Sequence, residues 1–239
     1  MQVFLAIFSF LLGLAIGSFL NVLIYRLPRN LSIIKPGSRC PHCGTPIKPY
    51  DNIPIISYII LKGKCRHCGM PISPIYPIVE GITGILFLVL YLKFKFPLAL
   101  KYMTLTALLI AISFIDAREK LIPDVLSIPW IGIGLLLTLI LKDLPILQVV
   151  ISTVASGFLF WVLRMSFTKI LKREALGEGD ILLIMLIASY SGLWGTYFSM
   201  LVGSFTAVLT HLLFPEKIKG EIPFGPFLSF GAIVGILTL

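Results

Sequence analysis

Long apolar runs, separated by charged or Pro/Gly-rich breaks, recur along most of the chain. A transmembrane α-helix needs about 20 consecutive apolar residues, and most of these runs approach that length. The run that begins at Asp180 and the run 224–239 are short, so the number of spans lies between six and eight. We therefore predict an all-α polytopic membrane protein with about eight transmembrane helices, at residues 3–25, 77–94, 97–115, 125–141, 146–163, 180–191, 194–213 and 224–239.

The composition supports this prediction. Of the 239 residues, 57% are hydrophobic and 13% are charged, whereas an ordinary soluble domain has about 25% charged residues. The net charge of +9 would be compatible with a nucleic-acid partner in a soluble protein. In so apolar a chain it is better explained by orientation in the bilayer, because Lys and Arg collect in cytoplasmic loops. We expect membrane lipid, and no nucleic acid, among the partners.

The distribution of basic residues predicts the orientation. No basic residue precedes the first apolar run and several follow it, which is the reverse of a secretory signal. We therefore interpret residues 1–25 as a retained first span with its N-terminus outside. The inside loops are then 26–76, 116–124, 164–179 and 214–223, and they hold sixteen of the 20 Lys and Arg residues. The four on the other side are Lys93, Lys95, Lys101 and Lys142.

The long polar insertion 26–76 contains all four cysteines, as Cys40-Pro-His-Cys43-Gly and Cys65-Arg-His-Cys68-Gly. Two C-x2-C knuckles separated by about 20 residues are typical of a structural zinc site with four thiolate ligands. We predict that Cys40, Cys43, Cys65 and Cys68 bind zinc, and that a glycine after each pair lets backbone amides turn toward the sulfurs. A closed site of this kind would stabilise the loop and take no part in catalysis.

Other interpretations of the cysteines remain. Two disulfides are possible, although they are rare on the reducing side of the membrane. A thioredoxin-like redox pair is disfavoured because no βαβ pattern surrounds either motif. His42 and His67 lie inside the knuckles and could replace a cysteine as ligand, but exposed positions are the simpler expectation.

Two aspartates lie at the predicted cytoplasmic edge of the membrane. Asp116 ends one span, and Asp180 begins another after Gly177-Glu178-Gly179. Facing carboxyl groups could share a proton, so that one acts as general base on a water and the other as general acid. The structural alternative is a helix-end role, which suits Asp180 at a helix N-terminus better than Asp116 at a C-terminus. Two glycines before Asp180 would let the backbone bend tightly.

Two further acids are weaker candidates. Asp124 follows Pro123 and fits the start of the next span. Glu80 lies near the beginning of the second span. An acid at this depth is either a buried polar contact or part of a second site.

Several more motifs accompany these features in a fixed order over nearly the whole chain. They are Gly17-Ser-Phe-Leu-Asn-Val-Leu-Ile-Tyr-Arg-Leu-Pro28, Tyr50-Asp-Asn-Ile-Pro-Ile-Ile-Ser57, Tyr76-Pro-Ile-Val-Glu80, Ile122-Pro-Asp124 and Pro223-Phe-Gly-Pro-Phe-Leu228. Together with the knuckles and Gly-Glu-Gly-Asp180, they make the chain resemble the type IV prepilin peptidases, bifunctional membrane enzymes of the G-x-G-D aspartic peptidase group.

The resemblance implies that Asp116 and Asp180 are the catalytic pair. It implies cleavage of the leader of type IV prepilins or pseudopilins at the cytoplasmic face of the inner membrane, followed by methylation of the new N-terminal amine from S-adenosylmethionine. The implied division is a first span at 1–25, a zinc-knuckle domain and methyltransferase part at 26–76, and a peptidase domain at 77–239.

The methyl-donor residues are not marked by a glycine-rich motif, and Glu80 and the segment around Asn52 are the candidates. The family often has a lysine two residues after the second aspartate, where this chain has Leu182. The role of that lysine in substrate contact is therefore open here.

A transporter or channel with a zinc-stabilised loop is an alternative, in which Asp116 and Asp180 would bind ions or relay protons. The acids lie at one predicted edge of the membrane, however, whereas transporter sites lie near the midplane. A scaffold protein would leave the G-x-G-D motif and the paired acids unexplained.

Overall fold

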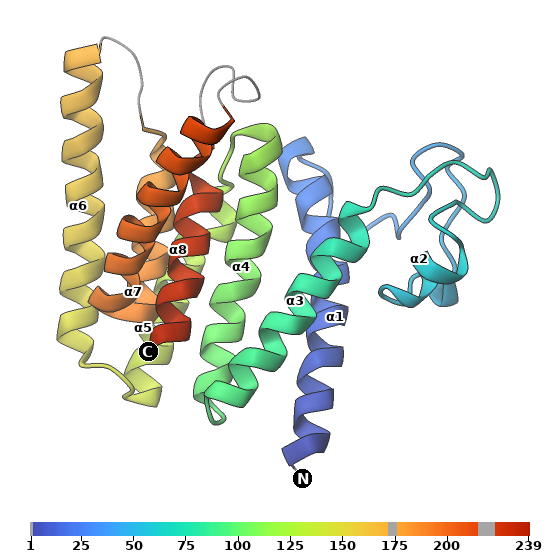
Figure 1. Ribbon diagram of the computed structural model, residues 1–239, viewed down its shortest axis with the longest axis horizontal. Helices are drawn as coiled ribbons and strands as arrows, with labels where there is room; N and C mark the ends of the chain where they lie inside the picture. The colour runs from blue at the N-terminus through green and yellow to red at the C-terminus, as the bar shows by residue number, and fades with distance from the viewer. Residues whose placement is uncertain (1, 172–175, 215–222) are drawn as a thin grey trace. The chain divides into compact units, whose positions relative to one another are not determined.

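The computed structural model describes residues 2–171, 176–214 and 223–239 (Figure 1). Regular structure in these residues is helical, with short 3-10 turns and two isolated β-bridges but no longer strand. The chain divides into two compact units, Met1–Ala99 and Leu100–Leu239.

The first unit is an antiparallel helix pair with a long insert. Helices α1 (Gln2–Arg26) and α3 (Ile75–Lys93) pack along one another. A Cβ on Gly13 would lie 2.7 Å from the Cα of Gly84, and one on Gly17 would lie 2.7 Å from the Cα of Glu80. Small residues spaced four apart thus bring the two backbones close, as they do in many membrane helix pairs. The insert between the helices contains η1 (Leu27–Arg29), η2 (Pro49–Asp51) and the short helix α2 (Ile56–Ile60).

The second unit is a helical bundle in which α7 is the central element. It packs against α5, α6 and α8. The elements are α4 (Leu98–Glu119), η3 (Asp124–Leu126), α5 (Ile128–Leu141), α6 (Ile146–Leu171), α7 (Glu178–Leu213) and α8 (Gly225–Thr238).

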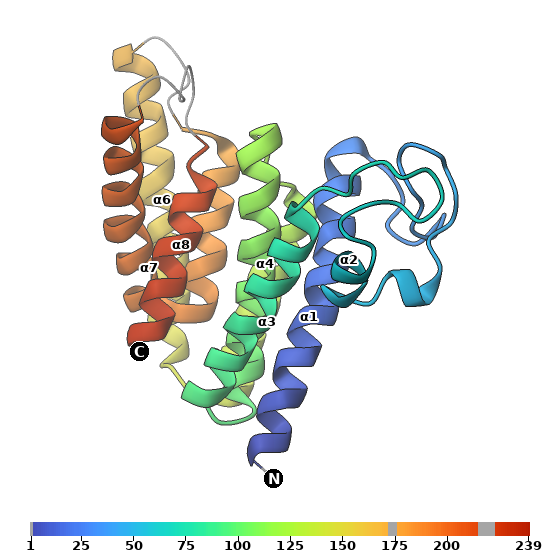
Figure 2. The same cartoon turned by 45° about the vertical axis from the view of Figure 1, so that its right-hand side comes forward.

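Helix α7 consists of two segments that meet at Gly192, where φ is +60° and ψ is −153°. Only glycine adopts such a conformation without strain. Both views show the chain reversing its direction there (Figures 1 and 2). The contacts with α8 agree, since Trp194 reaches Thr238 at the C-terminal end of α8 and Gly203 lies against Phe227 near its start.

Among the described residues, six helical segments are long and apolar enough to cross a membrane. They are Gln2–Arg29, Ile75–Lys93, Leu98–Glu119, Asp124–Leu141, Ile146–Ile170 and Glu178–Leu213. With α7 counted as two segments and α8 added, the helices coincide with the eight predicted ranges, so the all-α polytopic fold is confirmed. Helices α4 and α6 extend several residues beyond the predicted 115 and 163, because polar residues continue a helix past the apolar part that hydropathy detects.

Candidate active site and metal centre

Asp116 lies in the last turn of α4, three residues before the helix ends at Glu119. Its side chain is buried, and its Oδ2 accepts a hydrogen bond of 2.8 Å from the backbone N–H of Gly225, at the start of α8. A Cβ at Gly225 would lie 2.7 Å from that oxygen, so only glycine permits this approach. The start of α8 therefore holds the Asp116 carboxyl group in place.

Asp180 is the third residue of α7 and is 9% exposed. Its Oδ2 accepts a hydrogen bond of 3.2 Å from the N–H of Gly177, the residue before the helix. This is the reciprocal half of a capping box. The expected helix-end role of Asp180 is therefore present in the structure, and it leaves Oδ1 available for other chemistry.

The glycines before Asp180 do not act as we expected. Gly177 has φ −71° and Gly179 lies in the helix, so neither residue uses a backbone conformation reserved for glycine, and the prediction of a tight bend is wrong. Gly179 serves close packing instead, because a Cβ there would lie 2.7 Å from the Cβ of Ile122. This contact brings the start of α7 against the segment that follows α4, and thus Asp180 toward Asp116.

The two predicted aspartates are close enough to interact electrostatically. Each has its Oδ2 bound to a glycine N–H, and among the described residues neither Oδ1 has a hydrogen-bond partner. Two acids that influence each other's protonation in this way suit general acid–base work on a water, in which one is ionised and the other protonated. Asp124 is exposed at the first position of η3 and is not part of the pair.

The residue between the two glycines, Glu178, is linked to α6. Its Oε1 accepts a hydrogen bond of 2.7 Å from Nη1 of Arg164. The Glu178 side chain is 77% exposed, and an ion pair so open to solvent adds about 1 kcal/mol or less to stability. It nevertheless ties the first turn of α7 to the neighbouring helix.

The four cysteine sulfurs of the insert lie within 4.8 Å of one another. All four thiols are free, and the Sγ atoms of Cys40 and Cys68 are 3.8 Å apart. Tetrahedral zinc with bonds of about 2.3 Å to sulfur requires sulfurs about 3.8 Å apart. The donor set and its spacing therefore fit a four-coordinate metal ion, and the alternative of two disulfides does not describe this arrangement.

Both knuckles use the same turn. The N–H of the first cysteine donates to the carbonyl five residues on, and the glycine N–H donates back to the first cysteine's carbonyl. Gly44 and Gly69 have φ values of +70° and +69°, which explains the glycine after each pair. The two turns end in equivalent β-bridges, Arg39–Pro46 and Lys64–Pro71.

Hydrogen bonds favour the thiolate, the form that binds metals, at Cys43 and Cys65, whereas burial and hydrogen bonds with the other thiols raise the pKa of Cys68 to about 11. Hydrogen bonds with the hydroxyl and amide of Thr45 lower the pKa of Cys43 to about 6. Amides of Cys68 and His67 lower the pKa of Cys65. Arg66, inside the second knuckle, forms a bidentate ion pair with Asp51, and its hydrogen bonds lower the pKa of the Asp51 carboxyl group.

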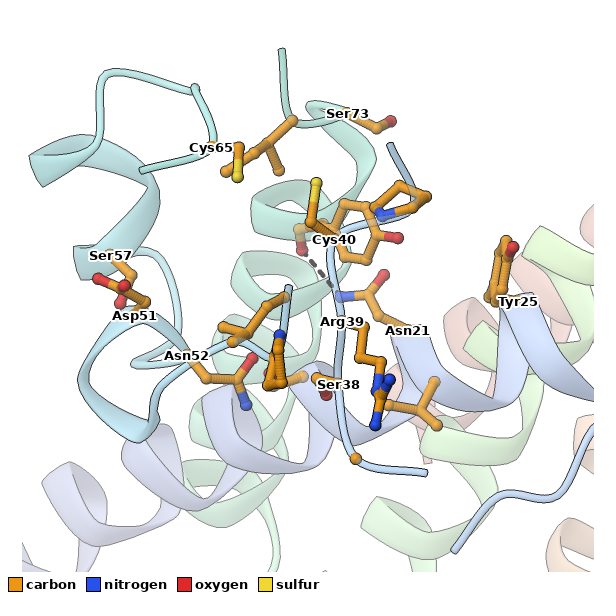
Figure 3. Close-up of a pocket in the computed structure, with 18 of the residues that line it drawn as sticks. Asn21, Tyr25, Ser38, Arg39, Cys40, Asp51, Asn52, Ser57, Cys65 and Ser73 are labelled. Atoms are coloured by element: carbon orange, nitrogen blue, oxygen red, sulfur yellow. Dashed lines mark hydrogen bonds between the residues drawn. The ribbon is translucent and has the colours of Figure 1, made fainter. Parts of the chain in front are cut away.

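A cavity of about 690 Å³ opens within the first unit, lined by α1, α3 and the insert. Figure 3 shows Asn21 and Tyr25 of α1 on one side of it and Asp51, Asn52 and Ser57 of the insert on the other. Its size is within the range of sites for cofactor-sized molecules. The methyl-donor candidates Asn52 and Glu80 both line this cavity.

Glu80 also has a structural task. It is 7% exposed, and its Oε2 accepts a hydrogen bond of 2.8 Å from the N–H of Ile55. Ile55 has φ +61°, a strained conformation for a β-branched residue. The hydrogen bond helps to hold this segment at the edge of the cavity.

Comparison with known proteins places these features in one family. Residues 11–94 match the bacterial peptidase A24 N-terminal domain, and residues 103–212 match the type IV leader peptidase family. The chain is 33% identical to a prepilin leader peptidase/N-methyltransferase of Dickeya chrysanthemi, with 95% of this chain and 90% of that protein covered. The chain belongs to the type IV leader peptidase family.

Other relatives agree with this membership. The chain is 31% identical to a prepilin leader peptidase/N-methyltransferase of Neisseria gonorrhoeae, covering 91% of this chain and 85% of the relative. It is 36% identical to a type 4 prepilin-like proteins leader peptide-processing enzyme of Escherichia coli, covering 94% and 90%. No solved structure matches the chain. The matches do not favour the transporter or channel interpretation.

Some residues of this family member's sites were not identified from the sequence. Gly225 contributes a backbone N–H, which side-chain patterns do not reveal, although its motif was noted. Asn21 lines the cavity and donates to the carbonyl of Tyr76 at 3.1 Å (Figure 3). A polar residue within an otherwise apolar span was the available signal for it.

Proposed function

We propose that this chain is a membrane aspartic endopeptidase that removes the leader peptide of type IV prepilins or pseudopilins, with Asp116 and Asp180 as its catalytic pair. The observation that carries the proposal is the pairing of these two buried acids, each with one oxygen bound to a glycine N–H and one oxygen available. The names of the relatives support the substrate class.

The chemistry follows from the pair. One aspartate, ionised, takes a proton from a water as the water oxygen attacks the scissile carbonyl carbon, while the other donates its proton to the carbonyl oxygen. Collapse of the tetrahedral intermediate breaks the carbon–nitrogen bond, and the proton held by the first aspartate goes to the leaving amine. One hydroxyl of the intermediate returns its proton to the second aspartate as the carboxyl product forms. The Gly177 and Gly225 N–H groups orient both carboxyl groups throughout.

The charge distribution supports a location in the inner membrane with the N-terminus outside and the aspartates at the cytoplasmic edge. The leader of a prepilin would then reach the acids from the cytoplasm while its apolar helix stays in lipid. Type IV pilus assembly and type II secretion are the systems that use such substrates.

The zinc proposal concerns Cys40, Cys43, Cys65 and Cys68. Four thiolates leave no open coordination position, so zinc would stabilise the insert 26–76 and not act on the substrate. Removing zinc from the purified protein should abolish methylation and lower the melting temperature of the first unit. A sample without bound zinc, or with an unchanged melting profile after chelation, would contradict this site.

The methyltransferase proposal assigns the cavity of the first unit to S-adenosylmethionine, which supplies an electrophilic methyl group. Asn52, Glu80 and Asn21 line the cavity and would bind its polar groups. In this division, 1–25 is the first span, 26–76 is the zinc-knuckle domain and centre of the methyltransferase part, and 77–239 is the peptidase domain, whose acids lie on α4 and α7. The methyl-donor site would also use Glu80 of α3, because α3 belongs to the first compact unit.

Mass spectrometry of a prepilin incubated with the protein in liposomes, with and without S-adenosylmethionine, tests both activities. We expect loss of the leader in both samples and one added methyl group only with the methyl donor. An intact prepilin in both samples would overturn the peptidase proposal. A cleaved but unmethylated product would overturn the methyltransferase proposal alone.

A further inference from the structure

The short helix α2 exposes three isoleucines on one face. Ile56, Ile59 and Ile60 are 54%, 68% and 67% exposed. Their spacing of three and four residues is that of one apolar stripe on a helix. Ile53, one turn earlier, is also exposed. Within the described residues of the insert, this stripe is an apolar surface with no protein partner.

The opposite face of α2 is firmly attached to the insert. Ser57 is buried, its hydroxyl donates to the carbonyl of Tyr50 at 2.9 Å, and it accepts the N–H of Ile53 at 2.9 Å. These bonds fix the rotation of α2 about its axis. The stripe therefore points away from the interior of the insert, because Ser57 on the opposite face is bound to it.

The start of α2 is anchored below the end of a membrane-spanning helix. Ile55 donates its N–H to Glu80, and its Cδ1 would lie 3.7 Å from a Cβ on Gly81. Glu80 is the sixth residue of α3, about 8 Å into the helix at a rise of 1.5 Å per residue. Glu80 also packs against Gly17, nine residues before α1 ends at Arg26. In both views α2 lies to the side of the α1 and α3 pair, below the level at which α1 ends (Figures 1 and 2).

Exposed lysines flank the stripe. Lys62 lies two residues after α2 in a left-handed conformation with φ +52°, Lys64 follows it, and Lys48 precedes the segment. Lysine side chains that flank a buried apolar segment extend toward the interface, where anionic head groups attract them. Exposed apolar side chains continue on α3, where Ile78, Ile82 and Ile85 are exposed.

We propose that α2 is an interfacial helix, inserted beside α1 and α3 at the boundary between head groups and acyl chains, with its isoleucine stripe in contact with lipid. The flanking lysines bind the phosphates of anionic lipids. The partner is thus the bilayer itself. Contact of α2 with lipid would hold the insert 26–76, and with it the 690 Å³ cavity, at the membrane surface. This proposal does not depend on the catalytic role proposed above.

Depth-dependent fluorescence quenching tests the proposal on the full chain in vesicles of phosphatidylethanolamine and phosphatidylglycerol. Ile59→Trp adds a reporter on the stripe, and His42→Trp adds a matched reporter at an exposed knuckle position. The signal of the unmodified chain, which has three tryptophans, is subtracted. We expect lipid brominated near the glycerol end of the acyl chains to quench residue 59 at least about twofold more than residue 42, because an interfacial helix buries its apolar face to that depth.

Two results would overturn the proposal. Long-wavelength emission from residue 59 without quenching would place the stripe in water. Short-wavelength emission that bromolipid does not quench would show that protein covers it. A photo-reactive benzophenone side chain at Ile60 gives an independent reading without a tryptophan, since lipid adducts support the proposal and adducts to protein alone contradict it.

Discussion

The second unit contains two buried charged sites near opposite ends of α4. Lys101 lies in the first turns of the helix and Asp116 in its last turn, about 22 Å apart at 1.5 Å per residue. Lys101 is paired with an opposite charge, whereas Asp116 is paired with a second acid. The same helix therefore carries a compensated charge and an uncompensated one.

The Lys101 site satisfies its charge completely. The Lys101 Nζ donates to both oxygens of Asp143, at 2.8 and 3.0 Å, and to the hydroxyl of Thr138 at 2.8 Å. A buried ion pair tolerates desolvation only when such additional bonds are present. Asp116 and Asp180 each accept one hydrogen bond from a backbone N–H, and each lies near a second acid. Burial is common to both sites, so it does not distinguish them; the charge of the partner does, because Lys101 lies against an acid whereas Asp116 lies near a second acid.

The largest expected effect is on the acid pair. Asp116→Asn or Asp180→Asn keeps an oxygen that can accept the glycine N–H, so the protein should fold, but neither variant can exchange the proton. We expect cleavage to fall at least about a thousandfold, as for other residues that act as a catalytic unit. Asp124→Asn, an exposed acid near the pair in sequence, is the matched control. Normal processing by either active-site variant would refute the assignment.

A comparable change at the other site should affect stability instead. Lys101→Met leaves Asp143 without its cation, and breaking a buried pair in this way costs about 3–5 kcal/mol. Thermal unfolding in detergent should show a lower melting temperature, while the folded fraction still cleaves substrate. The double variant Lys101→Met with Asp143→Leu should recover much of the loss. A single variant as stable as the unmodified chain would show that the pair is not structural.

A smaller effect is expected where packing sets the geometry of the acids. Gly179→Ala places a methyl group against Ile122, and overpacking of this kind costs about 1–3 kcal/mol. Because the methyl group would displace the start of α7 and with it Asp180, the rate of cleavage by the folded protein should fall, beyond any loss that lower stability explains. The pair Gly179→Ala with Ile122→Val makes room and should restore part of the activity. A loss of cleavage that the smaller folded fraction fully explains would argue against a positioning role for Gly179.

The smallest effect is expected at Glu80, a single buried acid with a hydrogen-bond donor. Glu80→Gln keeps an acceptor for the Ile55 N–H, so the free energy of unfolding should change by only about 1 kcal/mol. Leader cleavage should be unaffected, while the KM for S-adenosylmethionine in the methylation assay should rise. Glu80→Ala is the informative partner, because it removes the acceptor. A cleavage defect in the glutamine variant would place Glu80 outside the methyltransferase part.

The parts of the molecule that depend on local spacing could be predicted from the sequence. The cluster of four cysteines follows from the two knuckles, and the positions of the aspartates follow from the ends of the predicted spans. The break in α7 follows from the two predicted spans 180–191 and 194–213, which leave Gly192 between them. Lys101 and Asp143 are 42 residues apart, and no local pattern joins them. The Gly225 N–H and the contact of Gly179 with Ile122 are backbone and packing features, which residue type alone does not specify.

The reversal at Gly192 has a consequence for the bilayer. The first segment of α7 and helix α8 each have 14 residues, so each is about 21 Å long and shorter than a hydrocarbon core of about 30 Å. A membrane adapts to such hydrophobic mismatch by thinning around the short helices. Both helices begin near the aspartates, so we expect thinning of the bilayer there to shorten the distance between bulk water and the two buried acids.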